Sequence, residues 1–257
     1  MRDLDGRCFV LVHGAWHGGW CWDEVAARLR ARGATVYAPS FTGMGERAAE
    51  RDRFHGLETW LEDIAAVLRD GDLRDVLLVG HSFGGMVITG IADRMPERIA
   101  QLVYLDAAVP KSGQSMMTQN PEGTPEFNEQ RQAELEARRD EWLAPPPPEK
   151  LGMGATTPAV LARERALMTP HPMASFLDRL VLKGGGAPIP SSYIGCANPP
   201  MPHGGFVEHH AHVAAGDYGA HWHHAQLPTG HLCMATDPDR TAAALADAVL
   251  AWDRHPA

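Results

Sequence analysis

The sequence predicts an α/β fold with a mostly parallel central sheet of about six strands, flanked by helices. Short apolar runs typical of buried strands alternate along the chain with amphipathic helical segments. This alternation gives parallel strands joined by right-handed crossovers. The chain has 257 residues, of which 44% are hydrophobic, so it can bury a core large enough for one unit of this kind.

The elements of this core follow in a regular order. Apolar runs predict strands at residues 8–12, 34–38, 75–80, 101–105, 192–196 and 220–227. Helical spacing predicts helices at residues 20–32, 59–69, 86–95 and 240–252. Gly33 and Pro96 stand where two of these helices should end. Residues 41–53 are rich in Gly and Arg and are expected to form a loop.

Residues 111–186 interrupt the alternation. They contain a charged helical stretch at 125–143, a stiff proline run at 145–148 and a second helical stretch at 158–168. Insertions this long are usually functional. We therefore expect a helical lid, 111–186, inserted in a core formed by 1–110 and 187–257. Its apolar residues either line a substrate pocket or pack the lid itself: Met116, Met117, Trp142, Met153, Leu167, Met168 and Phe176.

The charge and the cysteines exclude several classes of partner. A net charge of −9 disfavours nucleic acid or an anionic membrane as partner. Neither a signal-peptide core nor a run approaching the ~20 apolar residues of a membrane span is found. The cysteines lack metal or redox spacing, which indicates free thiols in a reducing compartment: Cys8, Cys21, Cys196 and Cys233. We expect a cytoplasmic protein, and the excess of Arg over Lys is typical of a GC-rich bacterial genome.

A Gly-x-Ser-x-Gly sequence, with Ser82 at its centre, lies between the strongest predicted strand and the next helix. A sharp turn at this place lifts the serine hydroxyl above the sheet, and Gly80 and Gly84 allow the backbone to approach closely. The helix that follows directs its N–H groups toward developing negative charge. We predict Ser82 as a nucleophile; the alternative is a glycine-rich turn in another α/β protein.

The loop after the first strand, residues 13–20, can supply part of an oxyanion hole. A tetrahedral intermediate needs two N–H donors in place before its charge develops. We expect the backbone N–H of Phe83, after the nucleophile, to be one donor and that of Ala15 to be the other. The alternative is a turn that only connects strand and helix.

His231 follows the last predicted strand, so it should lie at the same edge of the sheet as Ser82. A serine hydroxyl is a weak nucleophile unless an imidazole removes its proton. We therefore predict His231 as the base. His81, which precedes the nucleophile, should point elsewhere and have a structural role.

The chain resembles the α/β-hydrolase superfamily over nearly its full length. Within it, the chain is similar to the compact branch of plant methylesterases and hydroxynitrile lyases and their bacterial relatives. The resemblance rests on VLVHGAWHGGW at 10–20, GHSFGG at 80–85, LDAAVP at 105–110 and GH at 230–231. It implies an α/β-hydrolase fold with a serine-histidine-acid site. Plant hydroxynitrile lyases commonly have Thr where Gly14 stands and Lys where Leu232 stands, which disfavours lyase chemistry here.

Two regions compete to supply the acid. In the plant relatives the acid follows the strand that corresponds to 192–196, but here Asn198 stands in that region without a carboxylate. Asp106 ends the strand after the nucleophile helix, on the same edge, and some α/β hydrolases take their acid from this strand. We predict Asp106, with Asn198 or no acid as the alternative. Asp217 should lie near the opposite edge, and Asp237 should cap the last helix.

Histidines crowd residues 203–224 without the spacing of metal ligands, so we expect surface or packing roles and neither a metal nor a cofactor. These are His203, His209, His210, His212, His221, His223 and His224.

Together these features predict a serine hydrolase of carboxylesterase, thioesterase or lactonase type, acting on a small-to-medium apolar carbonyl substrate through an acyl-enzyme on Ser82. One alternative is a non-hydrolytic enzyme of the same fold that performs cyclisation, elimination or a lyase step in bacterial biosynthesis. Another is a receptor-like binding protein. The expected partner is a small molecule, not nucleic acid or membrane, and a homodimer stays open.

Overall fold

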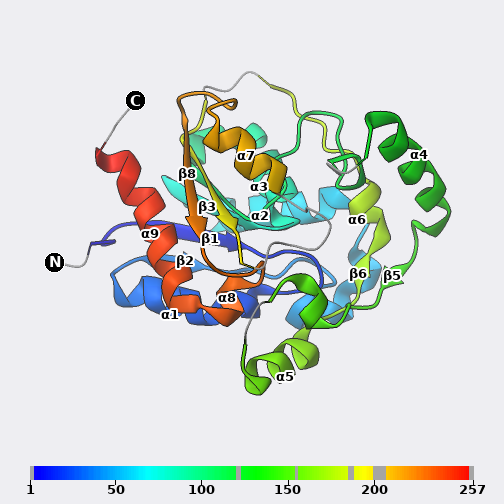
Figure 1. Cartoon of the computed structure of the whole chain (residues 1–257), viewed down its shortest axis with the longest axis horizontal. Helices are drawn as coiled ribbons and strands as arrows, with labels where there is room; N and C mark the ends of the chain where they lie inside the picture. The colour runs from blue at the N-terminus through cyan, green and yellow to red at the C-terminus, as the bar shows by residue number, and fades with distance from the viewer. Residues whose placement is uncertain (1–2, 120–122, 154–155, 185–187, 199–206, 255–257) are drawn as a thin grey trace.

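A computed structural model describes residues 3–119, 123–153, 156–184, 188–198 and 207–254 (Figure 1). Its centre is a six-stranded sheet in the order β2-β1-β3-β4-β7-β8, with parallel pairing throughout. The prediction of an α/β fold with about six parallel strands is confirmed. The strands are β1 (Cys8–Val12), β2 (Thr35–Tyr37), β3 (Val76–His81), β4 (Ile99–Leu105), β7 (Ser191–Cys196) and β8 (Trp222–Leu227).

Both faces of the central strands are buried, which explains their uninterrupted apolar sequences. Along β1, Phe9 and Leu11 belong to one apolar cluster, whereas Val10 and Val12 belong to the other, because successive side chains alternate. Helices α1 (Asp23–Ala31), α8 (Cys233–Thr236) and α9 (Pro238–Arg254) contribute to the first cluster. Helices α2 (Leu57–Asp70) and α3 (Gly84–Arg94) contribute to the second.

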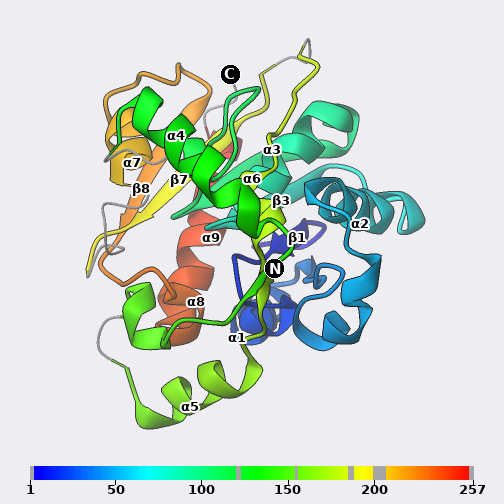
Figure 2. The ribbon, with the colours of Figure 1, turned by 90° about the vertical axis from the view of Figure 1, so that its right-hand side faces the viewer.

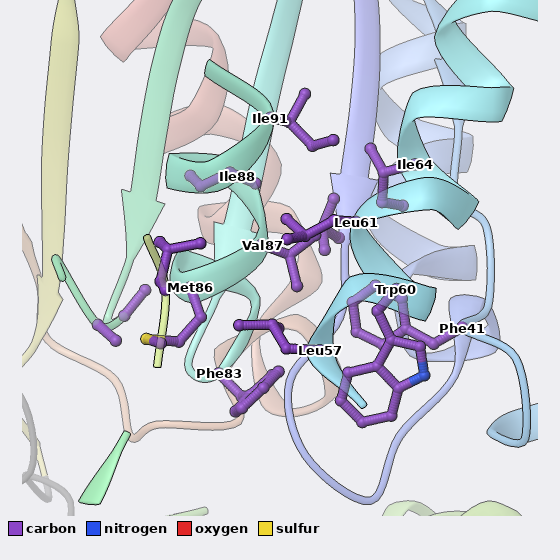
Figure 3. Packing of buried hydrophobic residues seen from close by; sticks show 14 of the residues in the cluster. Phe41, Leu57, Trp60, Leu61, Ile64, Phe83, Met86, Val87, Ile88 and Ile91 are labelled. Carbon is purple, nitrogen blue, oxygen red and sulfur yellow. The ribbon is translucent and has the colours of Figure 1, made fainter. Parts of the chain in front are cut away.

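The cluster around α2 and α3 holds the start of α3 in place (Figure 3). Phe41 stacks on Trp60 with ring centroids 4.7 Å apart, and the indole Nε1–H of Trp60 donates to the carbonyl of Thr42 at 3.0 Å. Phe83 packs edge-on against Trp60 at 5.4 Å. Because Phe83 immediately follows Ser82, this packing also fixes the turn in which Ser82 lies.

The segment between β4 and β7 forms an insertion that adds no strand to the main sheet among the described residues. It runs from α4 at the top to α5 at the bottom of the face shown in Figure 2. Its elements are η4 (Met117–Gln119), α4 (Pro125–Leu135), η5 (Glu136–Arg138), β5 (Trp142–Leu143), η6 (Pro148–Leu151), α5 (Pro158–Leu167), β6 (His171–Pro172) and α6 (Met173–Leu177).

The insertion corrects one prediction about its first helix. The helix expected over residues 125–143 ends as α4 at Leu135, because Trp142 and Leu143 pair with Pro172 and His171 in a small antiparallel sheet. This pairing partner lies about thirty residues further along the chain, so the local helical pattern could not predict it.

The core differs from the prediction at several further places. Residues 41–53 are not wholly a loop, because Gly45–Arg53 forms the 3-10 segment η2, held by ion pairs of Arg47 with Glu50 and Asp63. Helix α1 begins at Asp23 after the 3-10 turn η1 (Gly19–Trp22). The remaining elements are η3 (Pro96–Arg98), the unpredicted helix α7 (Val207–Ala214), and α8, which was also not predicted.

Candidate active site

Ser82 lies in a strained turn between β3 and α3. Its φ is 55°, and its carbonyl accepts the N–H groups of Gly85 and Ala108, each at 3.1 Å. A Cβ on Gly84 would lie 2.7 Å from the carbonyl oxygen of Val12, so this position requires glycine. The local sequence therefore forces a tight turn that directs the serine out of the sheet edge.

Positive φ angles concentrate around this turn. Five non-glycine residues of the described chain have positive φ, and three of them are Trp16, Ser82 and Asp106. Such backbone geometry costs about 1–3 kcal/mol per residue and persists where the surrounding structure imposes it. The three strained residues come from the ends of β1, β3 and β4, which meet at one edge of the sheet.

His231 is hydrogen-bonded to Asp106. Its Nδ1 lies 2.6 Å from Asp106 Oδ2, and the side chains are 3% and 6% exposed, respectively. The other carboxylate oxygen, Oδ1, accepts the backbone N–H of Cys196 at 3.3 Å. Since a carboxylate only accepts, this geometry places a proton on His231 Nδ1. The carboxylate is thus held on both oxygens and fixes the imidazole.

The His81 side chain is hydrogen-bonded to the backbone of the loop that carries His231. Its Nε2–H donates to the backbone carbonyl of His231 at 2.9 Å, and the two rings are 4.4 Å apart. Burial, and then the nearness of His231, keep the pKa of His81 well below its usual value. His81 is therefore a neutral ring that does not oppose positive charge on His231, and the structural role predicted for it agrees with this contact.

His13 orients the peptide that carries the Ala15 N–H. Its Nδ1–H donates to the carbonyl of Gly14 at 2.8 Å, and its Nε2 accepts the N–H of Phe41 at 3.1 Å. Burial lowers the pKa of His13 to about 3, so the ring is neutral. In a trans peptide the C=O and N–H point in opposite directions, so the Ala15 N–H points away from His13.

The two predicted donors have N–H groups for which the described residues supply no partner. Within the described part of the chain, no hydrogen bond uses the backbone N–H of Ala15 or of Phe83. Both residues are buried, at 8% and 0% exposure. A buried unpaired N–H is uncommon and calls for an explanation, because it loses a hydrogen bond to water.

A small cavity is lined by Ser82, His231 and the loop after β1. Its volume is about 20 Å³, enough for about one water molecule. Among the described residues of the insertion, Leu151 contributes to its wall. The lining residues are Ala15, Trp16, His17, His81, Ser82, Leu151, His231 and Leu232.

The competing carboxylates and Asn198 lie elsewhere. Asn198 is exposed, and its backbone N–H donates to the carbonyl of Thr229 at 2.9 Å. Asp217 bonds His212 at 2.7 Å. Asp237 accepts the N–H of Arg240 at the start of α9.

The histidine-rich region forms packing contacts. His209 bonds the hydroxyl of Tyr218 at 2.9 Å, and the ring of His223 packs on Trp252. His203 lies outside the described residues. Among the described residues, no group of three or more His, Cys, Asp or Glu side chains is arranged to hold a metal ion.

Sequence reasoning missed three insertion residues at this site: Leu151, Glu164 and His171. Glu164 contacts His17, and His171 packs against Phe83 and Trp16. Only a buried contact between distant segments distinguishes them, and the local sequence around them carries no such signal. Several apolar residues expected near a substrate serve packing instead; Met153 and Met168, for example, are buried in the cluster of α1 and α9.

The fold and this edge of the sheet define an α/β hydrolase. The model of the alpha/beta hydrolase family matches residues 9–244, and the chain belongs to this family. Within the family it is an esterase-like hydrolase, as the resemblance predicted. No helix in the described residues combines the length and apolar character needed to cross a bilayer.

Three relatives illustrate this membership. The chain is 37% identical over 245 residues to a carbendazim hydrolyzing esterase of Nocardioides sp. (strain SG-4G), covering 93% of this chain and 98% of the relative. It is 38% identical over 114 residues, 43% of each chain, to a probable esterase of Oryza sativa subsp. indica. A solved extracellular alpha/beta-hydrolase from a Paenibacillus species, described as homologous to tobacco salicylic acid binding protein 2, superposes with a TM-score of 0.76 at 28% identity. That comparison covers 94% of this chain and 98% of the other.

Proposed function

We propose that this chain is a serine carboxylesterase with Ser82, His231 and Asp106 as its catalytic triad. The observation that carries the proposal is the 2.6 Å contact between His231 and Asp106 beside a cavity that Ser82 and His231 line together. With Nδ1 bonded to Asp106, Nε2 is the nitrogen that removes the Ser82 proton. The carboxylate holds the imidazole in the required tautomer and stabilises the imidazolium that forms.

The unpaired N–H groups of Ala15 and Phe83 serve as the oxyanion hole. Ser82 Oγ attacks the substrate carbonyl carbon, and the negative charge on the carbonyl oxygen is accepted by these two donors. Protonated His231 then gives its proton to the leaving alcohol, and an acyl group remains on Ser82. Water, deprotonated by His231, releases the acid and restores the serine.

We propose that the insertion, residues 111–186, acts as a lid. The cavity of about 20 Å³ is smaller than any ester substrate, so the enzyme must open to bind one. Leu151, as the insertion residue in the cavity wall, is the side chain that must be displaced. The aromatic surroundings of Phe83, His171 and Phe176 favour a small-to-medium apolar ester.

We propose that the enzyme works in the bacterial cytoplasm, that its partner is a small-molecule substrate, and that it does not bind nucleic acid. All four cysteines are free thiols, as a reducing compartment requires, and three of them are buried.

Labelling with a fluorophosphonate probe tests the proposal. Wild-type protein should react, and Ser82→Ala should not, because the probe bonds to an activated serine. Ser192→Ala is the matched control: Ser192 is buried on β7, where its hydroxyl accepts from Gln101, and labelling should persist. Wild-type protein that is not labelled would contradict the proposal.

A series of p-nitrophenyl esters with increasing acyl length then identifies the substrate size. Carbendazim belongs in the same assay, because the Nocardioides relative is named for its hydrolysis. Activity that survives in Ser82→Ala would exclude the acyl-enzyme route.

A further inference from the structure

Glu164 is a buried carboxylate that extends from helix α5 of the insertion to the turn after β1. The residue is 1% exposed, and its Oε2 lies 3.0 Å from Nε2 of His17, which is 3% exposed. Its second oxygen, Oε1, has no hydrogen-bond partner among the described residues. Burial of a carboxylate is costly unless it is paired, so removing either partner of this contact leaves an uncompensated polar group.

His17 connects Glu164 to the turn after β1 that carries the Ala15 N–H, called the oxyanion turn below. Its Nδ1–H donates to the carbonyl of Ala15 at 2.7 Å, while Nε2 faces Glu164. An imidazole held at both nitrogens has a fixed plane. The Ala15 carbonyl is therefore fixed from one side by a ring whose own position depends on Glu164.

The peptides on either side of the Ala15 Cα are thus held by two different rings. His13 holds the carbonyl of Gly14, whose peptide carries the Ala15 N–H, and His17 holds the carbonyl of the next peptide. The Ala15 N–H lies in the plane of the first peptide, and displacement of the second peptide moves the Ala15 Cα that both peptides share, and with it the N–H. His13 therefore sets the direction of that donor, and His17 contributes to its position.

A second contact set from the insertion holds the next residue. The carbonyl of Trp16 accepts the N–H of Thr169 at 2.9 Å, and the N–H of Trp16 lies 3.4 Å from His171 Nδ1. Trp16 has a φ of 63°, a conformation that a non-glycine residue keeps only when its surroundings impose it. Residues 164–171 therefore fix the turn at two successive peptides.

We propose that Glu164 is a positioning residue for the oxyanion hole, acting through His17 on the peptide geometry of Ala15. The proposal rests on the proposed function, in which the Ala15 N–H stabilises the oxyanion. It assigns the insertion a part in transition-state stabilisation in addition to covering the site. A purely structural contact would contribute to stability and leave the chemical step unchanged.

The neighbouring residue on α5 offers a matched control. Arg163 pairs with Asp23 at 2.9 Å and donates to the carbonyl of Trp20 at 3.1 Å. This contact also ties α5 to the core, but it does not reach Ala15. Arg163→Ala thus loosens the same helix while leaving the Glu164–His17 hydrogen bond in place.

The experiment compares Glu164→Ala, Glu164→Gln and Glu164→Asp with Arg163→Ala and wild type. Glutamine can keep a hydrogen bond to His17 Nε2, because its amide offers an acceptor oxygen as well as a donor NH₂ group, whereas aspartate keeps the charge but falls short by about 1 Å. The readouts are kcat and KM for a p-nitrophenyl ester, the melting temperature, and the affinities for a trifluoromethyl ketone and the matching methyl ketone. Only the fluorinated ketone forms a stable tetrahedral adduct that uses the oxyanion hole.

We expect Glu164→Ala to lower kcat by about 10- to 100-fold, since a catalytic group displaced by about 1 Å loses up to about 100-fold. Affinity for the trifluoromethyl ketone should fall in parallel, while KM and methyl-ketone affinity change little. Glu164→Gln should recover most of kcat, and Arg163→Ala should keep wild-type kcat.

Two results would overturn the inference. One is a kcat for Glu164→Ala equal to that of Arg163→Ala, with both ketone affinities unchanged. The other, should Glu164→Ala fail to fold, is a folded Glu164→Asp variant with wild-type kcat and ketone affinities. If wild-type protein has no Ser82-dependent activity, the proposed function itself is wrong and the inference is wrong with it; fluorophosphonate labelling identifies that case separately.

Discussion

Replacing Asp106 by asparagine should inactivate the enzyme while preserving its fold. The Cys196 N–H at 3.3 Å from Oδ1 requires an acceptor at that position. The amide oxygen of the substituted side chain would therefore take this place, and its NH₂ group would face His231 Nδ1, now 2.6 Å from Oδ2. A donor there requires the Nδ1 lone pair to accept and places the proton on Nε2, the wrong tautomer for a base.

The expected loss in kcat is about 10⁴-fold, the size of effect that the same change produces in another serine-histidine-aspartate enzyme. It corresponds to about 5.5 kcal/mol of transition-state stabilisation. The melting temperature should change little, because the asparagine side chain still hydrogen-bonds the Cys196 N–H and the His231 ring.

The assay is steady-state hydrolysis of a p-nitrophenyl ester, with the rate of fluorophosphonate labelling as a second readout. Asp237→Asn is the control: that carboxylate caps α9 by accepting the N–H of Arg240 and should leave kcat unchanged. A folded Asp106→Asn variant that keeps kcat within about tenfold of wild type would refute the triad assignment.

Three further predictions concern packing, access and acid stability. Gly230→Ala would place a Cβ 1.9 Å from the carbonyl oxygen of Gly152, so it should destabilise the protein by about 1–3 kcal/mol and reduce kcat; unchanged thermal melting would contradict this. Leu151→Ala should shift ester preference toward longer acyl chains, because it enlarges the cavity; an unchanged chain-length profile would exclude it as the barrier. The unfolding free energy should fall between about pH 7.5 and pH 5.5, by about 1 kcal/mol for each buried neutral histidine, because the unfolded chain binds protons near pH 6.5 that the folded chain does not. Urea unfolding at both pH values measures this, and a flat profile would contradict it; the residues are His13, His81 and His171, whose pKa values are all lowered by burial.

The parallel sheet was accessible to sequence reasoning because its strands are buried on both faces. Residues 8–12 and 76–79 form short apolar runs typical of strands buried on both faces, and β1 and β3 lie there in the structure. The sequence also predicted the sharp turn at Ser82, because Gly80 and Gly84 indicate a close approach of the backbone.

The choice of Asp106 as the candidate acid followed from the shared edge of parallel strands. Its geometry depends on the Cys196 N–H, a backbone donor whose role carries no mark in the sequence. Sequence reasoning favoured Asp106 over Asn198 by its position and because Asn198 carries no carboxylate, and in the structure Asn198 is exposed.

The insertion was the least predictable part because its local patterns compete with distant pairing. Trp142 and Leu143 lie at the end of a charged helical pattern, yet they pair as a strand with residues 171–172. Glu164 stands between two arginines and has the appearance of a solvated helix face, although it is buried. Such residues are identified only when the partner segment is known.

The close seating of Gly152 on Gly230 bears on how this enzyme could be re-engineered. Exchanging the insertion for that of a relative is an obvious route to a new substrate range. A grafted insertion would have to place a backbone carbonyl where that of Gly152 lies, against Gly230 in the loop that carries His231. Chimeras that keep this contact between the two glycines should fold and remain soluble. Those that introduce a side chain at either position should displace the loop that carries His231, whatever the new substrate.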